Sequence, residues 1–213
     1  RASFLRRNGG KAAVMESQGI FQIHPKADSN YLIAQNSTNP RNLMEKIFMD
    51  QYSFRKMNRA DISVYKRALY DILYQNMSRI APTGNAYEED FEIWSKYTVP
   101  RWSGGQCAVL LIFSADRLCG YFQYALVNGT FLMEEIQFDA SVQGSGLFTE
   151  LYRYLIRILP PQTQYVEAYA NKKNEKAQAI LSRLGLKIAG ENKNGRSFRF
   201  RGDYACLRER YSQ

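Results

Sequence analysis

A glycine-rich turn is the first feature of this sequence that could do chemistry. In the stretch FDASVQGSGLFTELY, residues 138–152, an apolar run leads to Gly144 and Gly146, and an amphipathic run follows at once. A strand that ends in glycines and opens a helix leaves backbone N–H groups unpaired at the positive end of the helix dipole. Such a place suits an anion, most often a phosphate. A tight connection without a ligand has the same pattern, because short glycine motifs are common.

The composition is that of an ordinary globular chain. Of 213 residues, 45% are hydrophobic and 23% are charged. No apolar run approaches the roughly 18 residues that a membrane span needs. We therefore expect one main domain, with or without an appendage, and no membrane segment.

Cysteine and histidine are too few and too scattered to predict a disulfide framework or a metal site. Cys107, Cys119 and Cys206 form no CxxC pair, and His24 is the single histidine. Cys107 and Cys119 lie in apolar stretches, where an inert buried thiol is favoured over a nucleophile. We expect a cytoplasmic protein without a bound metal.

The formal net charge of +9 raises the question of nucleic-acid binding. Residues 196–211, RSFRFRGDYACLRERY, alternate arginines with aromatic residues. A strand with one basic, solvated face gives the same pattern. Residues 1–15 contain four basic residues and no acid, so part of the charge has a local source. Nucleic acid is therefore an unfavoured partner.

The chain before residue 53 divides into two parts. Residues 1–15 are expected to be a flexible arm or a remnant of cloning. In residues 16–52, the runs GIFQIH and NYLIAQ predict a hairpin, and RNLMEKIFMDQY predicts an amphipathic helix. This extension should pack on the rest of the chain or on a second copy of it.

From residue 53 the pattern predicts a mixed α/β fold with a mostly antiparallel central sheet and helices on both faces. The expected elements are, in order, a strand at 53–57, helices at 60–77 and 86–98, strands at 106–114, 119–127 and 129–138, a helix at 146–159, a strand at 164–171, a helix at 174–186 and a hairpin over 186–200. In the helix at 146–159, the expected buried stripe is Leu147, Leu151, Tyr154, Leu155 and Ile158.

This order of elements, with the glycine turn after three meandering strands, resembles the GCN5-related N-acetyltransferase (GNAT) family. The family's diphosphate loop reads Gln/Arg-x-x-Gly-x-Gly/Ala. Gln143 and Gly146 hold its first two defined positions, and Phe148 stands where the third would be small. The resemblance covers about residues 53–204, and it implies transfer of an acyl group from acyl-coenzyme A to an amine.

A second family pattern lies in the following helix. Asn174, Ala177 and Gly185-Leu186 hold the matching places, and Leu181 stands where the family usually has tyrosine. Two motifs in the correct order support the resemblance more strongly than either does alone.

The resemblance implies where coenzyme A would bind. Its diphosphate would lie on the turn formed by Gln143, Gly144, Ser145, Gly146, Leu147 and Phe148. The pantetheine arm would run along the preceding strand, beside Ile136 and Phe138, whose side chains should be core. The adenine end would lie near Asn174, where Asn171, Lys172, Lys173 and Lys176 offer donors or form a merely solvated face.

The resemblance also implies a catalytic carboxylate. The attacking amine must be neutral, and most amines are protonated at pH 7. In relatives, acids at this distance before the loop bind or deprotonate the amine, which points to Glu134 or Glu135. Strand alternation sends the two side chains to opposite faces, so that only one of them should act directly. An acid paired with a neighbouring Lys or Arg is the alternative for either residue.

The departing thiolate needs a proton, which Leu181 cannot supply. Water, Tyr169, Ser182 or Tyr204 could supply it instead. No Cys or Ser has an evident partner base, so transfer should be direct, in a ternary complex.

Three functions remain open on the sequence. The favoured one is an N-acetyltransferase that uses acetyl-CoA and acts, as a monomer or homodimer, on the amine of a small molecule or peptide. Loops around 75–105 and the N-terminal extension would set that acceptor. The second is a coenzyme A-binding module with weakened catalysis, which Leu181 and Phe148 favour. Nucleic-acid association ranks third.

Overall fold

The computed structural model describes residues 51–212. The expected arm at 1–15 and nearly all of the expected extension at 16–52 lie outside the described residues. The first described strand begins at Tyr52, one residue before the expected start.

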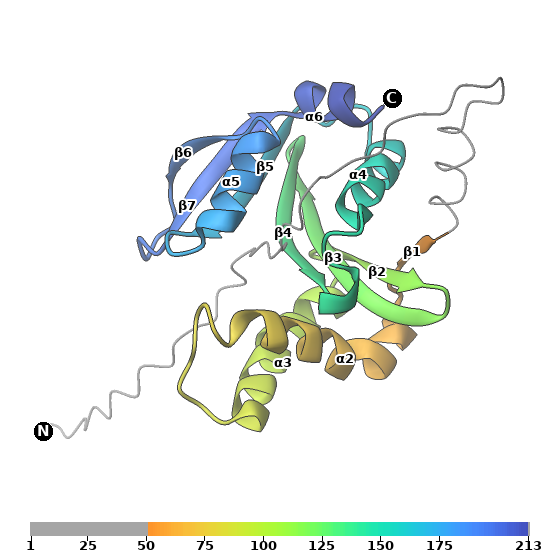
Figure 1. The fold of residues 1–213 in the computed structure, drawn as a ribbon, viewed down its shortest axis with the longest axis vertical. Helices are drawn as coiled ribbons and strands as arrows, with labels where there is room; N and C mark the ends of the chain where they lie inside the picture. The colour runs from red at the N-terminus through yellow and green to blue at the C-terminus, as the bar shows by residue number, and fades with distance from the viewer. Residues whose placement is uncertain (1–50, 213) are drawn as a thin grey trace, which may run out of the picture.

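Seven strands form one sheet in the order β1-β2-β3-β4-β5-β7-β6 (Figure 1). Every neighbouring pair is antiparallel except β4 and β5, which are parallel. The prediction of a mixed, mostly antiparallel sheet is therefore confirmed. The strands are β1 (Tyr52–Lys56), β2 (Ala108–Ser114), β3 (Arg117–Val127), β4 (Thr130–Phe138), β5 (Tyr165–Asn171), β6 (Lys187–Glu191) and β7 (Ser197–Asp203).

Helices cover both faces of this sheet, as expected (Figure 1). One face is covered by α2 (Arg59–Met77) and α3 (Tyr87–Ser103), and the other by α4 (Leu147–Ile158), α5 (Glu175–Arg183) and α6 (Tyr204–Tyr211). A short 3-10 turn, η1 (Ala140–Val142), leads from β4 to the glycine turn.

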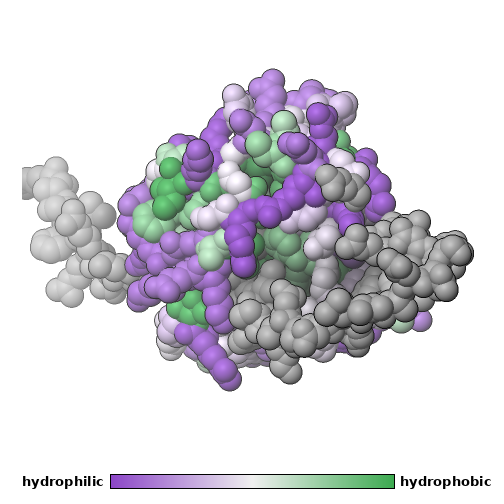
Figure 2. All heavy atoms as spheres, turned by 45° about the horizontal axis from the view of Figure 1, so that its top comes forward, coloured by the Kyte–Doolittle hydropathy of each residue, from purple (hydrophilic) through white to green (hydrophobic). Residues whose placement is uncertain are grey.

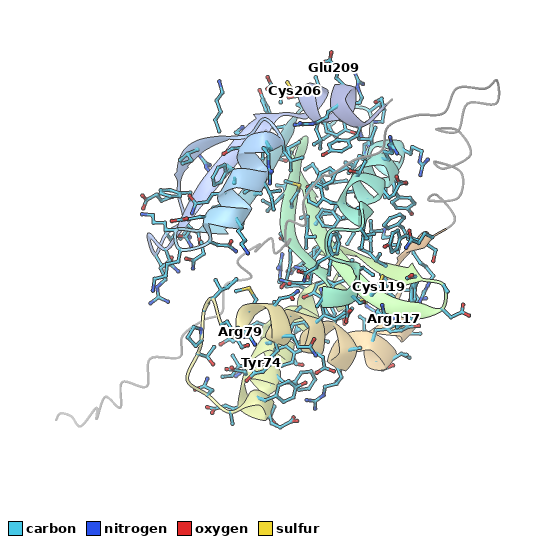
Figure 3. All side chains as sticks on the ribbon, viewed as in Figure 1. Tyr74, Arg79, Arg117, Cys119, Cys206 and Glu209 are labelled. Atoms are coloured by element: carbon cyan, nitrogen blue, oxygen red, sulfur yellow. The ribbon has the colours of Figure 1, made fainter. Side chains whose placement is uncertain are left out.

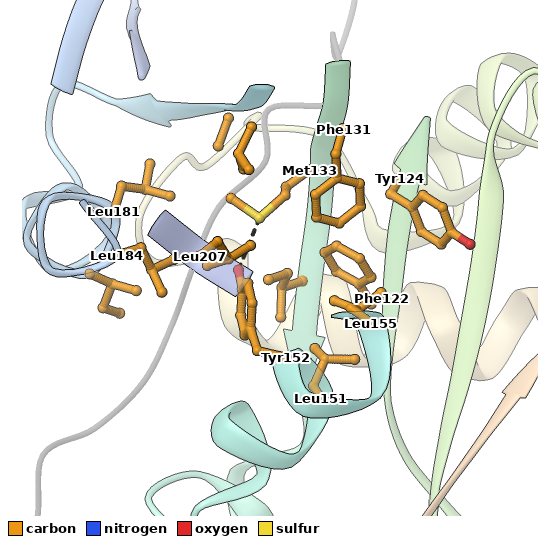
Figure 4. Packing of buried hydrophobic residues seen from close by; sticks show 14 of the residues in the cluster. Phe122, Tyr124, Phe131, Met133, Leu151, Tyr152, Leu155, Leu181, Leu184 and Leu207 are labelled. Atoms are coloured by element: carbon orange, nitrogen blue, oxygen red, sulfur yellow. Dashed lines mark hydrogen bonds between the residues drawn. The ribbon is translucent and has the colours of Figure 1, made fainter. Parts of the chain in front are cut away.

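Each face of the sheet has its own hydrophobic core. Under α2 and α3, aromatic residues such as Tyr70, Trp94 and Trp102 pack on Leu111 and Tyr121 of the sheet. The other core lies between α4, α5, α6 and the sheet, and Figure 4 shows its centre around Phe122, Met133, Leu155 and Leu181. Figure 2 shows mostly hydrophilic side chains around the rim of the visible face, with hydrophobic atoms deeper near its middle.

The start of α2 is fixed by a reciprocal cap. The Asn58 side chain accepts hydrogen bonds from the N–H groups of Ala60 and Asp61, and Asp61 Oδ2 accepts one from the Asn58 N–H at 2.8 Å. Each contact satisfies a backbone donor that the first turn would otherwise leave unpaired. This cap fixes the start of the helix whose last turn carries Asn76, a residue in hydrogen-bond contact with Gln143 of the glycine turn.

Two features of the fold differ from the expectation. The buried face of α4 contains Leu147, Leu151, Tyr152 and Leu155, whereas Ile158 is 42% exposed. A final helix, α6, follows β7 directly and was not expected. It contributes only two buried residues, Tyr204 and Leu207. Two apolar positions followed by the basic run RERY are too few to show a helical period in the sequence.

Among the described residues, no helix is long and apolar enough to cross a membrane.

Candidate active site

The middle of the sheet opens between its two parallel strands. β5 pairs with β4 only from Thr130 to Met133, opposite Tyr165 to Ala168. In the rest of β4, residues 134–138, the ladder pairs are with β3 alone. The edge of β4 that faces β5 is therefore available there to an extended ligand, which could add backbone hydrogen bonds as another strand would.

A β-bulge lies where the two strands part. Gln123 of β3 pairs with Glu135, and Tyr124 pairs with Met133, so Glu134 is an extra residue in β4. A bulge breaks strict alternation along the strand. Both carboxylates consequently contact groups on the side of α2 and α3, and the expectation that they point to opposite faces is wrong.

The Glu134 carboxylate is held by an ion pair and an amide. Arg101 Nη2 of α3 donates to Oε1 at 2.5 Å, and Gln123 Nε2 donates to Oε2 at 2.6 Å. Gln123 is in turn held by the Trp102 indole N–H at 2.8 Å. Only 9% of the Glu134 side chain is exposed. This carboxylate is fixed in position and charge-compensated, so it is placed to orient a partner.

Glu135 has a different environment. It is 4% exposed, and burial raises its pKa from 4.5 to about 7, against the opposing effect of Tyr121 and Gln137. Gln137 Nε2 donates to Glu135 Oε1 at 3.3 Å. The Tyr121 hydroxyl faces the carboxyl group but lies outside ordinary hydrogen-bond geometry. A carboxyl group with a pKa near 7 can accept a proton and release it again at neutral pH.

The glycine turn has the geometry that its sequence predicts. Gly144 and Gly146 have φ of 80° and 85°, and Gly146 precedes the first residue of α4. A side chain at such angles would strain the backbone. In the described part of the chain, the N–H groups of Gly144, Gly146 and Leu147 have no hydrogen-bond acceptor. They lie at the positive end of the α4 dipole, an arrangement suited to a phosphate.

Side chains from two other elements hold this turn in place. The Tyr52 hydroxyl of β1 donates to Ser145 Oγ at 2.7 Å, and Ser145 Oγ donates to the Val142 carbonyl at 2.6 Å. Gln143 Nε2 donates to the Phe138 carbonyl at 3.1 Å. The turn is thus built before any ligand arrives, which lowers the entropy that binding must offset.

The end of β4 is less available than the sequence suggests. Ile136 and Phe138 are buried core residues, as expected. The Phe138 carbonyl, however, already accepts hydrogen bonds from Gln143 Nε2 and Asn76 Nδ2. Backbone groups nearer to the bulge are therefore better candidates for a pantetheine arm.

Solved structures with this architecture were found at low sequence identity. The aminoglycoside acetyltransferase AAC(6')-Ib, in complex with ribostamycin and coenzyme A, has a TM-score of 0.57 and 16% identity, covering 76% of this chain and 98% of its own. PaiA N-acetyltransferase from Thermoplasma acidophilum, in complex with coenzyme A, has a TM-score of 0.56 and 15% identity, covering 72% and 99%. FdhC, a nucleotide-linked sugar GNAT, has a TM-score of 0.53 and 12% identity, covering 77% and 93%.

The chain has the GNAT acetyltransferase fold. No protein-family model matches the sequence, and no curated protein matches it closely. The similarity to these proteins is therefore a similarity of three-dimensional fold.

The GNAT-like motif at Asn174 has a clear structural role here. Asn174 is 5% exposed and caps α5, its side-chain oxygen accepting from the Ala177 N–H at 3.0 Å. This contact explains why the asparagine and the alanine stand three residues apart. Among the nearby lysines, Lys172 forms an ion pair with Glu191 at 2.6 Å. Contact of Asn174 with the coenzyme stays a prediction.

The residue in place of the usual GNAT tyrosine is part of the core. Leu181 is fully buried against the α4 side of the sheet. Of the hydroxyls considered as substitutes, Tyr204 is buried, Tyr169 is half-buried and Ser182 is exposed.

A further hydroxyl, which sequence reasoning missed, contacts the β4 residue at which the strands part. The Tyr152 hydroxyl donates to Met133 Sδ at 2.9 Å, and Met133 is the last residue of β4 paired with β5 (Figure 4). Burial raises the pKa of Tyr152 well above its usual value, which keeps the hydroxyl protonated. The buried stripe expected for α4 included Leu151 and Tyr154 but not Tyr152, so the sequence did not point to this hydroxyl.

The cysteines occupy separate places (Figure 3). Cys119 is buried in the sheet and Cys206 is exposed on α6. Burial raises the pKa of Cys107 and of Cys119 to about 11, which leaves both thiols weakly nucleophilic at neutral pH. Within residues 51–212, no group of three or more His, Cys, Asp or Glu side chains could hold a metal ion.

Proposed function

We propose that this protein is an N-acetyltransferase that transfers the acetyl group of acetyl-CoA directly to an amine. The observation that carries the proposal is the preformed glycine turn at the start of α4. The turn follows β4, the strand that parts from β5, and Glu135 of β4 has a pKa of about 7. The coenzyme-bound neighbours of the same fold support this use of the turn.

Each end of the reaction has a candidate residue. The amine nitrogen attacks the thioester carbon, forming the C–N bond while the C–S bond breaks. The proton of the amine passes to Glu135, directly or through a water, and the departing thiolate takes a proton from water or from a hydroxyl such as that of Tyr169, which directly follows the last β5 residue paired with β4. Glu134, held by Arg101, orients the amine by accepting a hydrogen bond from it.

The acceptor is proposed to be a small-molecule amine. Ribostamycin is bound in the aminoglycoside acetyltransferase structure, and another neighbour, at TM-score 0.51, is SpeG spermidine N-acetyltransferase from Vibrio cholerae. These two classes, aminoglycosides and polyamines, form a first panel for assays by mass spectrometry of the acetylated product.

A coenzyme-binding module without catalysis is the second candidate. The replacement of the usual tyrosine by Leu181 in the core favours it. Nucleic-acid association is less favoured, because the basic segment is β7 followed by α6. Its arginines are partly engaged: Arg201 pairs with Glu167, and Arg199 donates to the Ala189 carbonyl.

The turn is tested by changing Gly146 to Asp. A carboxylate there repels the diphosphate and strains the φ of 85°, so the affinity for acetyl-CoA should fall by about 2 kcal/mol or more, roughly 30-fold in Kd. Isothermal titration calorimetry on the folded full chain measures this. Gly195→Asp is the matched control, since Gly195 also has positive φ but lies in the β6–β7 turn. Equal affinity in wild type and Gly146→Asp would overturn the proposed site.

A further inference from the structure

A chain of buried amides connects the glycine turn to Glu135. Gln143 Nε2 donates to Asn76 Oδ1 at 3.4 Å, and Asn76 Nδ2 donates to Gln137 Oε1 at 2.9 Å. Gln137 Nε2 then donates to Glu135 Oε1 at 3.3 Å. Gln137 belongs to β4 and Gln143 to the glycine turn, whereas Asn76 lies on the last turn of helix α2.

The hydrogen bonds of this amide chain all run in one direction. Asn76 and Gln137 each accept a hydrogen bond from the side of the turn and donate one toward Glu135, so a donor meets the carboxylate at the far end. A donor stabilises the ionised form of a carboxyl group over the neutral form. Asn76 is 7% exposed and Gln137 is 1% exposed, so bulk water competes little with these contacts.

We infer that Asn76 is a positioning residue that couples occupancy of the glycine turn to the ionisation of Glu135. The inference rests on the proposed function, because it requires a diphosphate on the turn. The same ordered chain holds Gln143 in the turn and Gln137 against the carboxylate. By linkage, whatever favours one end of such a chain favours the other by the same factor.

The other titratable groups that face Glu135 come from β3, from the segment before β2, from α3 and from β4 itself. Burial raises the pKa of Tyr121 of β3 well above 10 and that of Cys107, before β2, to about 11, and the pKa of Arg101 of α3 is raised with Glu134 as its partner. Glu134, the neighbour in β4, is held in its ion pair with Arg101. A change of affinity across this pH range that depends on Glu135 therefore reports its own ionisation.

The sign of the pH dependence separates this coupling from simple repulsion. Through space, an ionised Glu135 repels a diphosphate, so binding would tighten as the pH falls. Through the amide chain, protonation of Glu135 weakens the last hydrogen bond and loosens the turn, so binding should weaken as the pH falls.

The experiment is calorimetric titration of the full chain with dephospho-coenzyme A at pH 6, 7 and 8. This ligand keeps the diphosphate and lacks the phosphomonoester, whose second pKa of about 6 would otherwise add its own pH dependence. We expect the wild-type Kd to be about fivefold larger at pH 6 than at pH 8, in the usual range of coupling factors. Asn76→Leu, which keeps the branched shape of the side chain and removes its hydrogen bonds, should give a flat profile, as should Glu135→Gln.

Two further variants make the result decisive. Gln137→Met breaks the next link and should also be flat, and it replaces Asn76→Leu if that variant does not fold. Thr98→Val removes another buried polar group, on α3, and should keep the wild-type profile. A slope that persists in Asn76→Leu or Gln137→Met, a wild-type slope of opposite sign, or a flat wild-type profile would overturn the coupling. Absence of any coenzyme binding by the wild-type chain would instead overturn the proposed function itself.

Discussion

β4 presents unlike groups to the two faces of the sheet. Toward α4, α5 and α6 it contributes Phe131, Met133, Ile136 and Phe138 to a continuous hydrophobic core. Toward α2 and α3 it contributes Glu134, Glu135 and Gln137. Gln137 is hydrogen-bonded to Glu135 and to Asn76 of α2, and Glu134 forms an ion pair with Arg101 of α3. One strand thus separates a face that supplies stability by packing from a face that holds its polar groups ready for chemistry, and the bulge at Glu134 makes this separation possible.

The apolar face should respond most strongly to loss of volume. Leu155 of α4 is fully buried, so Leu155→Ala should lower the free energy of unfolding by about 2–5 kcal/mol through lost burial and a residual cavity. Urea denaturation followed by circular dichroism measures it. Ile158→Ala, one turn along the same helix and 42% exposed in the native protein, is the control and should cost at most about 0.5 kcal/mol. Equal losses in the two variants would show that the core does not follow this face of α4.

The polar face should instead reveal itself through pH. The pKa of Glu135 is about 7 in the folded protein and 4.5 in an exposed glutamate, so the fold favours its protonated form. This contribution is complete below about pH 4.5 and is lost as the pH rises through about 7, amounting to roughly 3 kcal/mol. Glu135→Gln does not titrate, so its stability relative to wild type should rise by about that amount between pH 4 and pH 8. A constant difference across that range would contradict the raised pKa.

The smallest of the three effects should come from the ion pair at the bulge. Arg101→Met leaves the nearly buried Glu134 carboxylate without its cation, which should cost about 1–3 kcal/mol of unfolding free energy. Adding Glu134→Gln removes the stranded charge and should restore part of that loss. The double-mutant cycle gives the coupling between the two residues. Additive effects would mean that the pair contributes nothing specific to this face.

Apart from α6, the sequence was sufficient for the order of strands and helices and for the glycine turn, because both depend on local patterns. Hydrophobic periodicity located each of the seven strands to within a few residues, and the glycines predicted a tight turn where Gly144 and Gly146 stand, both of which have positive φ in the structure. The family resemblance gave the fold, which the solved structures of the same architecture confirm.

The parts that could not be predicted depend on contacts between elements. The bulge is a matter of register between β3 and β4, and neither strand shows it alone. Tyr152 becomes notable only when Met133 lies opposite its hydroxyl. Asn76 did leave a trace in the sequence, since it is a polar residue on the otherwise apolar stripe that includes Leu69 and Leu73. That trace predicts a buried partner but not which one.

The position of α6 has a consequence for the order of events during synthesis. Leu207 fills the core under α4, and the Tyr211 ring stacks on Tyr152 with centroids 5.2 Å apart. At a translation rate of about 5–20 residues per second, the ribosome needs roughly 3 to 12 seconds to pass from Tyr152 to Tyr211. During that interval the apolar surface of α4 that α6 later covers is exposed on the nascent chain. A chaperone that binds apolar segments would act in this period.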